Sequence, residues 1–116
     1  SGFQIVEEAK QVVFQIGTMS FDSEFHVLKM YNETIKLTDK ESDILLELCR
    51  NQNNITDRRS LLLKVWGDDS FFNSRSLDVY ISKLRKYLKM DFNIELVTIR
   101  GKGFKLWTSN KKAFDN

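Results

Sequence analysis

Residues 74–106 constrain the fold of this chain more than any other part of its sequence. Their first half has the periodicity of a helix with one apolar stripe, formed by Leu77, Ile81, Leu84 and Leu88. Their second half alternates apolar and polar residues on both sides of Gly101-Lys102-Gly103, which is typical of a tight hairpin with glycines in its turn. The chain must therefore place an amphipathic helix directly before a β-hairpin.

The opposite face of this helix is rich in basic residues. It presents Arg75, Val79, Ser82, Lys83, Lys86 and Lys89, with Asp78 and Arg85 on its flank. A face that only solubilises a protein usually mixes both signs of charge, so the excess of cations favours an anionic partner over simple solvation. Val79 in its middle is suited to contact a thymine methyl group in the major groove of DNA. We expect Asp78, which would repel phosphate, to orient an arginine.

The net charge of the 116 residues is only +2, but it is distributed unevenly. Residues 74–107 contain eight lysines and arginines and three acidic residues, a net charge of +5, which leaves −3 for the remainder. Such an asymmetry is the electrostatic signature of a protein that binds nucleic acid.

The first part of the chain predicts a small antiparallel sheet. Between residues 14 and 37, short runs of β-forming residues are separated by turn-prone segments, and we expect three or four strands. Residues 3–13 predict no clear element and are either the end of a linker or a first strand that begins late.

Two helices are predicted between the sheet and the basic helix. Thr38 and Glu41 have the spacing of a capping box, and apolar residues follow at positions 44, 45, 48 and 49, until residues 51–54 stop the helix. A second helix is capped by Thr56 or Asp57 and ends at Gly67, with residues 61, 62, 65 and 66 turned inward. The loop 68–73 then leads to the basic helix, which we expect Asn73 or Ser74 to cap.

Several classes of function find no support in the sequence. Cys49 is the only cysteine, so an intramolecular disulfide is excluded and a buried hydrophobe is the favoured interpretation. His26 is the only histidine, and we expect it on the surface of an edge strand; with no carboxylate pair or metal cluster of suitable spacing, we expect no enzyme, no cofactor and no metal. No apolar run reaches the roughly 18 residues of a membrane span and no signal peptide is visible, so we expect a cytoplasmic protein without a membrane partner.

Taken together, these segments resemble the OmpR/PhoB-type winged-helix effector domain of two-component response regulators. The resemblance runs from Phe14 to Trp107 and rests on R-S-L-D-V-Y-I-S-K-L-R-K, on T-I-R-G-K-G-F, on Leu37-Thr38 with Glu41, and on the end of the second helix at residues 62–67. It implies an α+β fold with an N-terminal antiparallel four-stranded sheet, three helices and a C-terminal β-hairpin wing. It also implies sequence-specific binding of duplex DNA in a phosphorelay that controls transcription, with helix 74–89 in the major groove and wing 97–106 in the minor groove.

The charge pattern and the resemblance together give a set of candidate DNA-binding residues. They are Arg58, Arg75, Val79, Ser82, Lys83, Arg85, Lys86, Thr98, Arg100 and Lys102. By resemblance, Arg58 contacts the DNA backbone, Arg75 and Arg85 contact phosphates or bases, and Arg100 reaches the minor groove. The loop 67–73 matches a segment that contacts RNA polymerase in activators, with Asp68 and Asp69 as candidates, although loop acids are more often only solvated.

The resemblance also implies partners and a domain organisation. We expect a dimer on tandem DNA half-sites, and a receiver domain with a phosphorylatable aspartate that is missing from this chain. We expect residues 1–12 to be a tag remnant or interdomain linker, 13–109 the winged-helix domain and 110–116 a tail. Ser82 stands where many members have a basic residue, so the base preference cannot be transferred. The alternative is a winged-helix module used for protein–protein interaction, although such modules often lose the basic face that this helix keeps.

Overall fold

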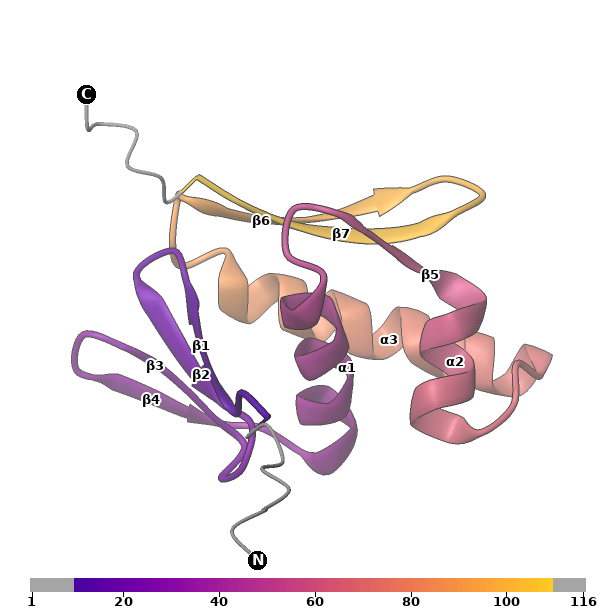
Figure 1. Ribbon diagram of the computed structural model, residues 1–116, viewed down its shortest axis with the longest axis horizontal. Coiled ribbons are helices and arrows are strands. Elements are labelled where there is room, and N and C mark those ends of the chain that lie inside the picture. Colours follow the sequence, from indigo (N-terminus) through magenta and orange to yellow (C-terminus); the bar gives the residue numbers. More distant parts are fainter. Residues whose placement is uncertain (1–9, 110–116) are drawn as a thin grey trace, which may run out of the picture.

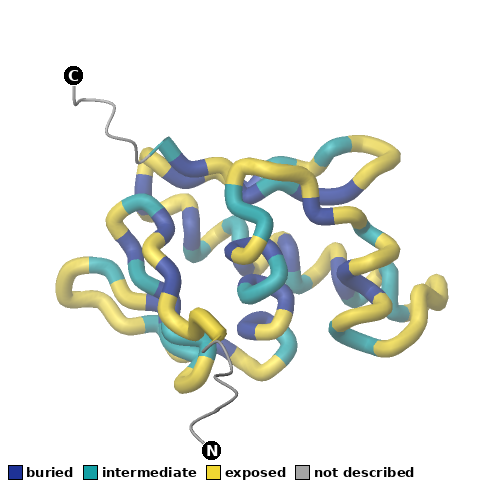
Figure 2. Tube along the Cα trace, viewed as in Figure 1, coloured by how far each residue is buried: buried dark blue, intermediate teal, exposed yellow. Residues whose placement is uncertain are grey.

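Two small sheets lie against three helices in the computed structural model, which describes residues 10–109 (Figure 1). Buried residues line the inner side of every helix and of most strands (Figure 2), and they form one continuous apolar core. Most of the expected linker 1–12 and the whole expected tail 110–116 lie outside the described residues. Within residues 10–109, no helix is long and apolar enough to cross a membrane.

The N-terminal sheet is a four-stranded antiparallel meander. It contains β1 (Val13–Ile16), β2 (Met19–Asp22), β3 (Val27–Met30) and β4 (Glu33–Lys36) in the order β1-β2-β3-β4. Its apolar residues alternate, and Phe14, Ile16, Met19, Phe21 and Leu28 are buried because they face the helices. The predicted sheet is therefore confirmed, with a first strand that begins late.

The prediction for His26 was wrong. His26 lies in the turn before β3 rather than in a strand, with a positive φ of 58°, and its Nδ1 is 3.2 Å from Oδ1 of Asp39. A left-handed backbone conformation at this position ends the strand-like alternation of side chains that the sequence pattern predicts. The histidine therefore lies next to the first helix.

Helix α1 (Asp39–Arg50) begins at the predicted capping box. Thr38 Oγ1 accepts a hydrogen bond from the amide of Glu41, and Oε1 of Glu41 accepts one of 2.9 Å from the amide of Thr38. The predicted apolar stripe at residues 44, 45, 48 and 49 is buried, and the helix ends at Asn51. Cys49 is buried in this stripe, which confirms it as a small buried hydrophobe, and this burial raises the pKa of its thiol far above the usual range.

A short strand that the sequence did not predict precedes the second helix. β5 (Ile55–Asp57) pairs with β7 (Gly103–Thr108), which in turn pairs with β6 (Ile94–Ile99), so the C-terminal hairpin belongs to a three-stranded sheet of order β5-β7-β6. Gly103 permits this pairing, because a Cβ at this position would overlap the carbonyl oxygen of Thr56. Asp57 then caps α2 (Arg58–Trp66), and Gly67 ends it with φ of 87°.

The basic helix α3 (Phe71–Leu88) starts one turn earlier than predicted. Its N-cap is Ser70, whose side chain accepts a hydrogen bond from the amide of Asn73, and neither Asn73 nor Ser74 has that role. The expected loop 68–73 is correspondingly shorter, because α3 already begins at Phe71. The apolar stripe of Leu77, Ile81, Leu84 and Leu88 is buried as predicted.

Candidate nucleic-acid interface

The outer face of α3 is exposed along its length. It comprises Arg75, Val79, Ser82, Lys83, Lys86 and Lys89, all of which are solvent-accessible. Val79 is 58% exposed although it is apolar. None of the ion pairs found within residues 10–109 involves Lys83 or Lys86. This face therefore offers unneutralised cations around an apolar centre.

The second basic surface is the tip of the hairpin formed by β6 and β7, which we call the wing. Arg100, Gly101 and Lys102 form its turn, where the amide of Lys102 donates a 2.9 Å hydrogen bond to the carbonyl of Ile99 and Gly101 has φ of 76°. Arg100 and Lys102 are exposed, and so is Thr98 on β6. The wing tip lies at the opposite end of the molecule from the N-terminal sheet (Figure 1).

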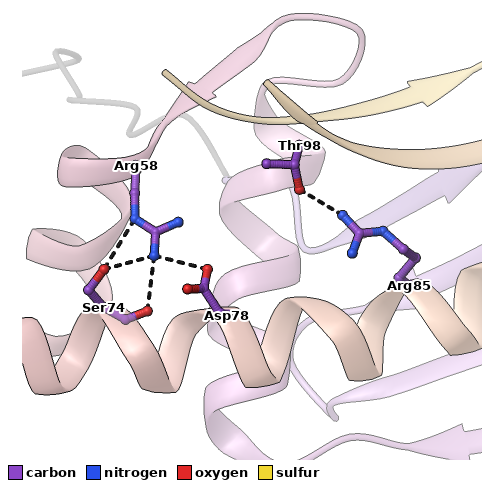
Figure 3. Close-up of polar contacts among 5 residues, drawn as sticks. All are labelled: Arg58, Ser74, Asp78, Arg85 and Thr98. Atoms are coloured by element: carbon purple, nitrogen blue, oxygen red, sulfur yellow. Dashed lines mark hydrogen bonds and ion pairs between the residues drawn. The ribbon is translucent and has the colours of Figure 1, made fainter. Parts of the chain in front are cut away.

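Arg58, predicted to contact the DNA backbone, is bound to α3. Its Nη2 donates hydrogen bonds to the carbonyl oxygen and the hydroxyl of Ser74, at 3.0 and 2.7 Å, and to Oδ1 of Asp78 at 2.9 Å (Figure 3). Its Nε donates to the same hydroxyl at 3.2 Å. The arginine that Asp78 orients is therefore Arg58 of α2, which a reading of α3 alone could not identify.

Arg85, the other candidate on the flank, is bound to the wing. Its Nε donates to the carbonyl oxygen of Leu96 at 2.8 Å. Its Nη2 donates to the hydroxyl of Thr98 at 2.9 Å, as Figure 3 shows. Arg85 and Thr98 therefore contact each other across the junction between α3 and β6.

The loop before α3 contains both predicted acidic candidates, and each has partners within it or next to it. Oδ1 of Asp68 accepts hydrogen bonds from the amide of Ser70 at 3.0 Å and from the side chain of Asn73 at 2.7 Å. Asp69 forms an ion pair of 2.8 Å with Arg59. The bonds from Ser70 lower the pKa of Asp68 and the bond from Arg59 lowers that of Asp69, so both carboxylates are ionised near neutral pH. They hold the loop in shape while remaining exposed.

The first turn of α3 adds two residues that the sequence reading missed. Phe71 and Phe72 are about three-quarters exposed, and the guanidinium of Arg75 lies 5.7 Å from the centre of the Phe71 ring. Together with Ser76 and Val79 they line a shallow hollow at the start of the helix. Ser70 three residues before Asn73 was the signal for this earlier cap, but two exposed phenylalanines obscured the amphipathic pattern.

Binding of a metal is not supported by the described part of the chain. Residues 10–109 contain no group of three or more histidine, cysteine or acidic side chains that could hold a metal ion. Helix α3 and the wing present exposed cations, hydroxyls and one apolar side chain, a set of groups suited to binding a polyanion.

Comparison with known proteins agrees with this geometry. A family model described as "Transcriptional regulatory protein, C terminal" matches residues 32–106. Transcriptional regulatory protein RprY of Bacteroides fragilis is 48% identical over 101 residues, which cover 87% of this chain and 43% of RprY. The chain thus spans less than half the length of this curated relative.

Two solved structures are similar in fold and 28% identical in sequence. The DNA-binding domain of RstA from Klebsiella pneumoniae, solved in complex with the RstA box, superposes with a TM-score of 0.67 over 84% of this chain and 98% of that chain. The response regulator DrrB of Thermotoga maritima, described as an OmpR/PhoB homolog, superposes with a TM-score of 0.70 over 84% of this chain and 45% of DrrB. The similarity is therefore that of one domain within longer regulators.

Proposed function

This chain belongs to the OmpR/PhoB-type winged-helix family, the C-terminal domains of transcriptional regulatory proteins, and we propose that it binds duplex DNA sequence-specifically as the effector domain of a response regulator. The function is binding rather than catalysis. The observation that carries the proposal is the proximity of two basic elements, the exposed face of α3 and the wing that Arg85 ties to it.

Helix α3 is the element that reads the major groove. Its 18 residues span about 27 Å, and a helix of this kind fits a groove about 12 Å wide. Val79 can contact a thymine methyl group, while Ser82 and Lys83 can hydrogen-bond to base edges. Arg75 and Lys86, nearer the ends of the face, are placed to neutralise phosphates.

The wing is the element that enters the minor groove. Arg100 and Lys102 at its tip are exposed cations, and a narrow A·T-rich minor groove attracts such side chains through its strong negative potential. Simultaneous contact with both grooves explains why the domain needs two separate basic elements.

The first test is the salt dependence of binding. With roughly six phosphate contacts, the slope of log K against log salt concentration should be about −5. Selection of bound sequences from a random duplex pool identifies the site, and mobility-shift titrations at several salt concentrations give the slope. Binding that does not change with salt, or that shows no preferred sequence, would contradict the proposal and favour a protein partner.

Point variants then test the groove assignment. Lys83→Ala should cost about 1–3 kcal/mol and relax base preference, while Arg100→Ala should weaken A·T-rich flanks most. Lys36→Ala in β4 is a matched control, because it removes one cation from the far sheet. Equal effects of all three variants would exclude the proposed orientation.

The remaining parts of the proposal concern partners. We propose that the domain binds tandem half-sites as a dimer, that a receiver domain precedes it in the whole protein, and that it acts in the cytoplasm. The short loop with Asp68 and Asp69 is a candidate contact for RNA polymerase, since both acids are exposed and fixed by hydrogen bonds. Titration of duplexes with one and two half-sites tests the dimer.

A further inference from the structure

Arg58 lies where the second helix, the recognition helix and the wing meet. Its side chain binds Ser74 and Asp78 of α3, and its guanidinium lies 5.6 Å from the centre of the Phe104 ring in β7. Its backbone amide donates a 3.0 Å hydrogen bond to the carbonyl of Lys102 in the wing turn. One residue therefore contacts both elements that the proposed function places on DNA.

Arg85 makes a second connection between the same two elements. It starts on α3 and binds the backbone of Leu96 and the hydroxyl of Thr98 on β6. The two arginines connect α3 at two points along its length: Arg58 of α2 binds its first half, and Arg85 in its second half binds the wing (Figure 3).

The geometry of these contacts indicates that both arginines hold neighbouring elements in place and are not free to bind a phosphate. Each arginine uses Nε and Nη2, and only a planar guanidinium presents both donors in one fork. The Arg58 side chain is 32% exposed, so part of its hydration has already been replaced by these bonds. In each residue only Nη1 has no partner within residues 10–109, which leaves little of either guanidinium for a phosphate.

We propose that Arg58 and Arg85 are positioning residues for DNA recognition, which fix the angle between α3 and the wing; this inference rests on the proposed function. The distance between neighbouring grooves of a duplex is set by the DNA. A domain that reads one groove and enters the other at the same time must hold its two elements at one spacing, to within about half an ångström. Without the two connections, the domain would have to order itself on binding and would lose affinity.

Loss of positioning has a different signature from loss of a phosphate contact. Binding to random DNA depends on phosphates and tolerates many orientations, whereas binding to the selected site requires both elements to dock together. A positioning residue therefore changes the ratio of specific to non-specific affinity, and it leaves the salt slope unchanged. A phosphate contact lowers both affinities and reduces the magnitude of the slope by about 0.9.

The experiment compares the chain with Arg58→Lys, Arg85→Lys and Asp78→Asn, on the selected duplex and on a scrambled duplex of equal length, over a range of salt. We expect the two lysine variants to bind the selected site about tenfold more weakly, since each loses fork-shaped charge-assisted bonds, with scrambled binding and slope unchanged. Arg50→Lys is the matched control, because within residues 10–109 the Arg50 side chain bonds only Glu47 of its own helix α1, at 2.9 Å, and this variant should keep the wild-type ratio. Thermal unfolding of each variant measures its folded fraction.

Asp78→Asn separates positioning from simple electrostatics. It removes one negative charge near the DNA, so electrostatics alone would tighten binding to both duplexes equally. Positioning predicts the opposite for the selected site, whose affinity should fall relative to that of the scrambled duplex. Asp78 is exposed, so this variant keeps the fold and provides the decisive measurement even where Arg58→Lys unfolds.

Several outcomes would overturn the inference. Positioning would be excluded if the lysine variants kept the wild-type ratio of specific to non-specific affinity, or if the magnitude of their salt slope fell by about 0.9. It would also be excluded if Asp78→Asn bound both duplexes more tightly. These results are distinguishable from failure of the proposed function, in which the unmodified chain itself would show no preferred site and no salt dependence.

Discussion

The two sheets of this domain are of similar size but differ in how they are built and in what they present. The N-terminal sheet pairs strands that follow one another in sequence, and residues 13–36 carry two lysines and three acids, a net charge of −1. The C-terminal sheet pairs β5 with a strand far along the chain, and residues 94–108 carry three cations and one acid, a net charge of +2. The N-terminal sheet thus forms by local pairing alone, whereas the positively charged C-terminal sheet also needs the long-range pairing of β5 with β7.

The two sheets are also attached to the helices in different ways. Asp91, buried after α3, accepts hydrogen bonds of 2.6 Å from both the amide and the hydroxyl of Thr18, between β1 and β2. The C-terminal sheet is attached through β5 and through Arg58 and Arg85. Disrupting one attachment at a time should therefore affect stability in the first case and both stability and DNA binding in the second.

The largest effect on stability is expected where β5 pairs with β7. Gly103→Ala forces the backbone of β7 away from Thr56 and should lower the free energy of unfolding by about 3 kcal/mol or more. Chemical denaturation measures this change. Gly101→Ala is the control, because its added Cβ meets no atom within 4 Å and only its positive φ costs stability; a Gly103→Ala variant as stable as this control would show that β7 can accommodate a Cβ next to Thr56.

The next effect is expected at the attachment of the N-terminal sheet. Asp91→Asn places an amide where the carboxylate accepts bonds from Thr18 and Asn93, and should cost about 2–3 kcal/mol at neutral pH. DNA affinity per folded molecule should stay unchanged, because the Asp91 carboxylate is buried against Thr18 and is not part of the exposed face of α3 or of the wing tip. A loss of specific affinity in the folded protein would contradict the separation between the two sheets.

The same carboxylate predicts a pH dependence. Burial raises the pKa of Asp91, but the bonds from Thr18 and Asn93 outweigh this effect and leave it below its ordinary value. Because the folded-state pKa is the lower one, the carboxylate stabilises the fold at neutral pH, and this contribution disappears as the pH falls below about 4. The difference in stability between wild type and Asp91→Asn should therefore shrink on acidification, and denaturation at several pH values measures it.

The same contrast explains which features the sequence could predict. The capping box of Thr38 and Glu41 and the meander of β1–β4 depend on neighbours in the chain, so their patterns were readable. β5 was missed because a three-residue strand has almost no periodicity and its partner lies far along the chain. The exposed cations of α3 were predicted from one helical face, but the partners of Arg58 and Arg85 lie on other elements, and no local pattern encodes such contacts.

A smaller effect should distinguish the charges of the two sheets. Arg100→Ala at the wing tip should weaken DNA binding by about 1–2 kcal/mol and reduce the magnitude of the salt slope by about 0.9. Lys29→Ala in β3 removes the same charge from the N-terminal sheet and should leave the slope unchanged. Titrations at several salt concentrations measure both; equal slopes for the two variants would mean that the wing does not contact phosphate.

The smallest effect is expected in two hairpin turns, one from each sheet. Both turns contain a residue with positive φ, but that residue differs between them. The wing turn has Gly101 at φ of 76°, whereas the turn between β3 and β4 has Tyr31 at φ of 51°, with its side chain 82% exposed. A left-handed conformation costs an ordinary residue about 1–2 kcal/mol, while the added freedom of glycine in the unfolded chain offsets about half of this. Tyr31→Gly should therefore stabilise the protein by about 0.5–1 kcal/mol, and Gly101→Ala should destabilise it by a similar amount. Chemical denaturation of both variants measures the pair, and a destabilised Tyr31→Gly would show that the tyrosine ring packs on the N-terminal sheet strongly enough to outweigh its backbone strain.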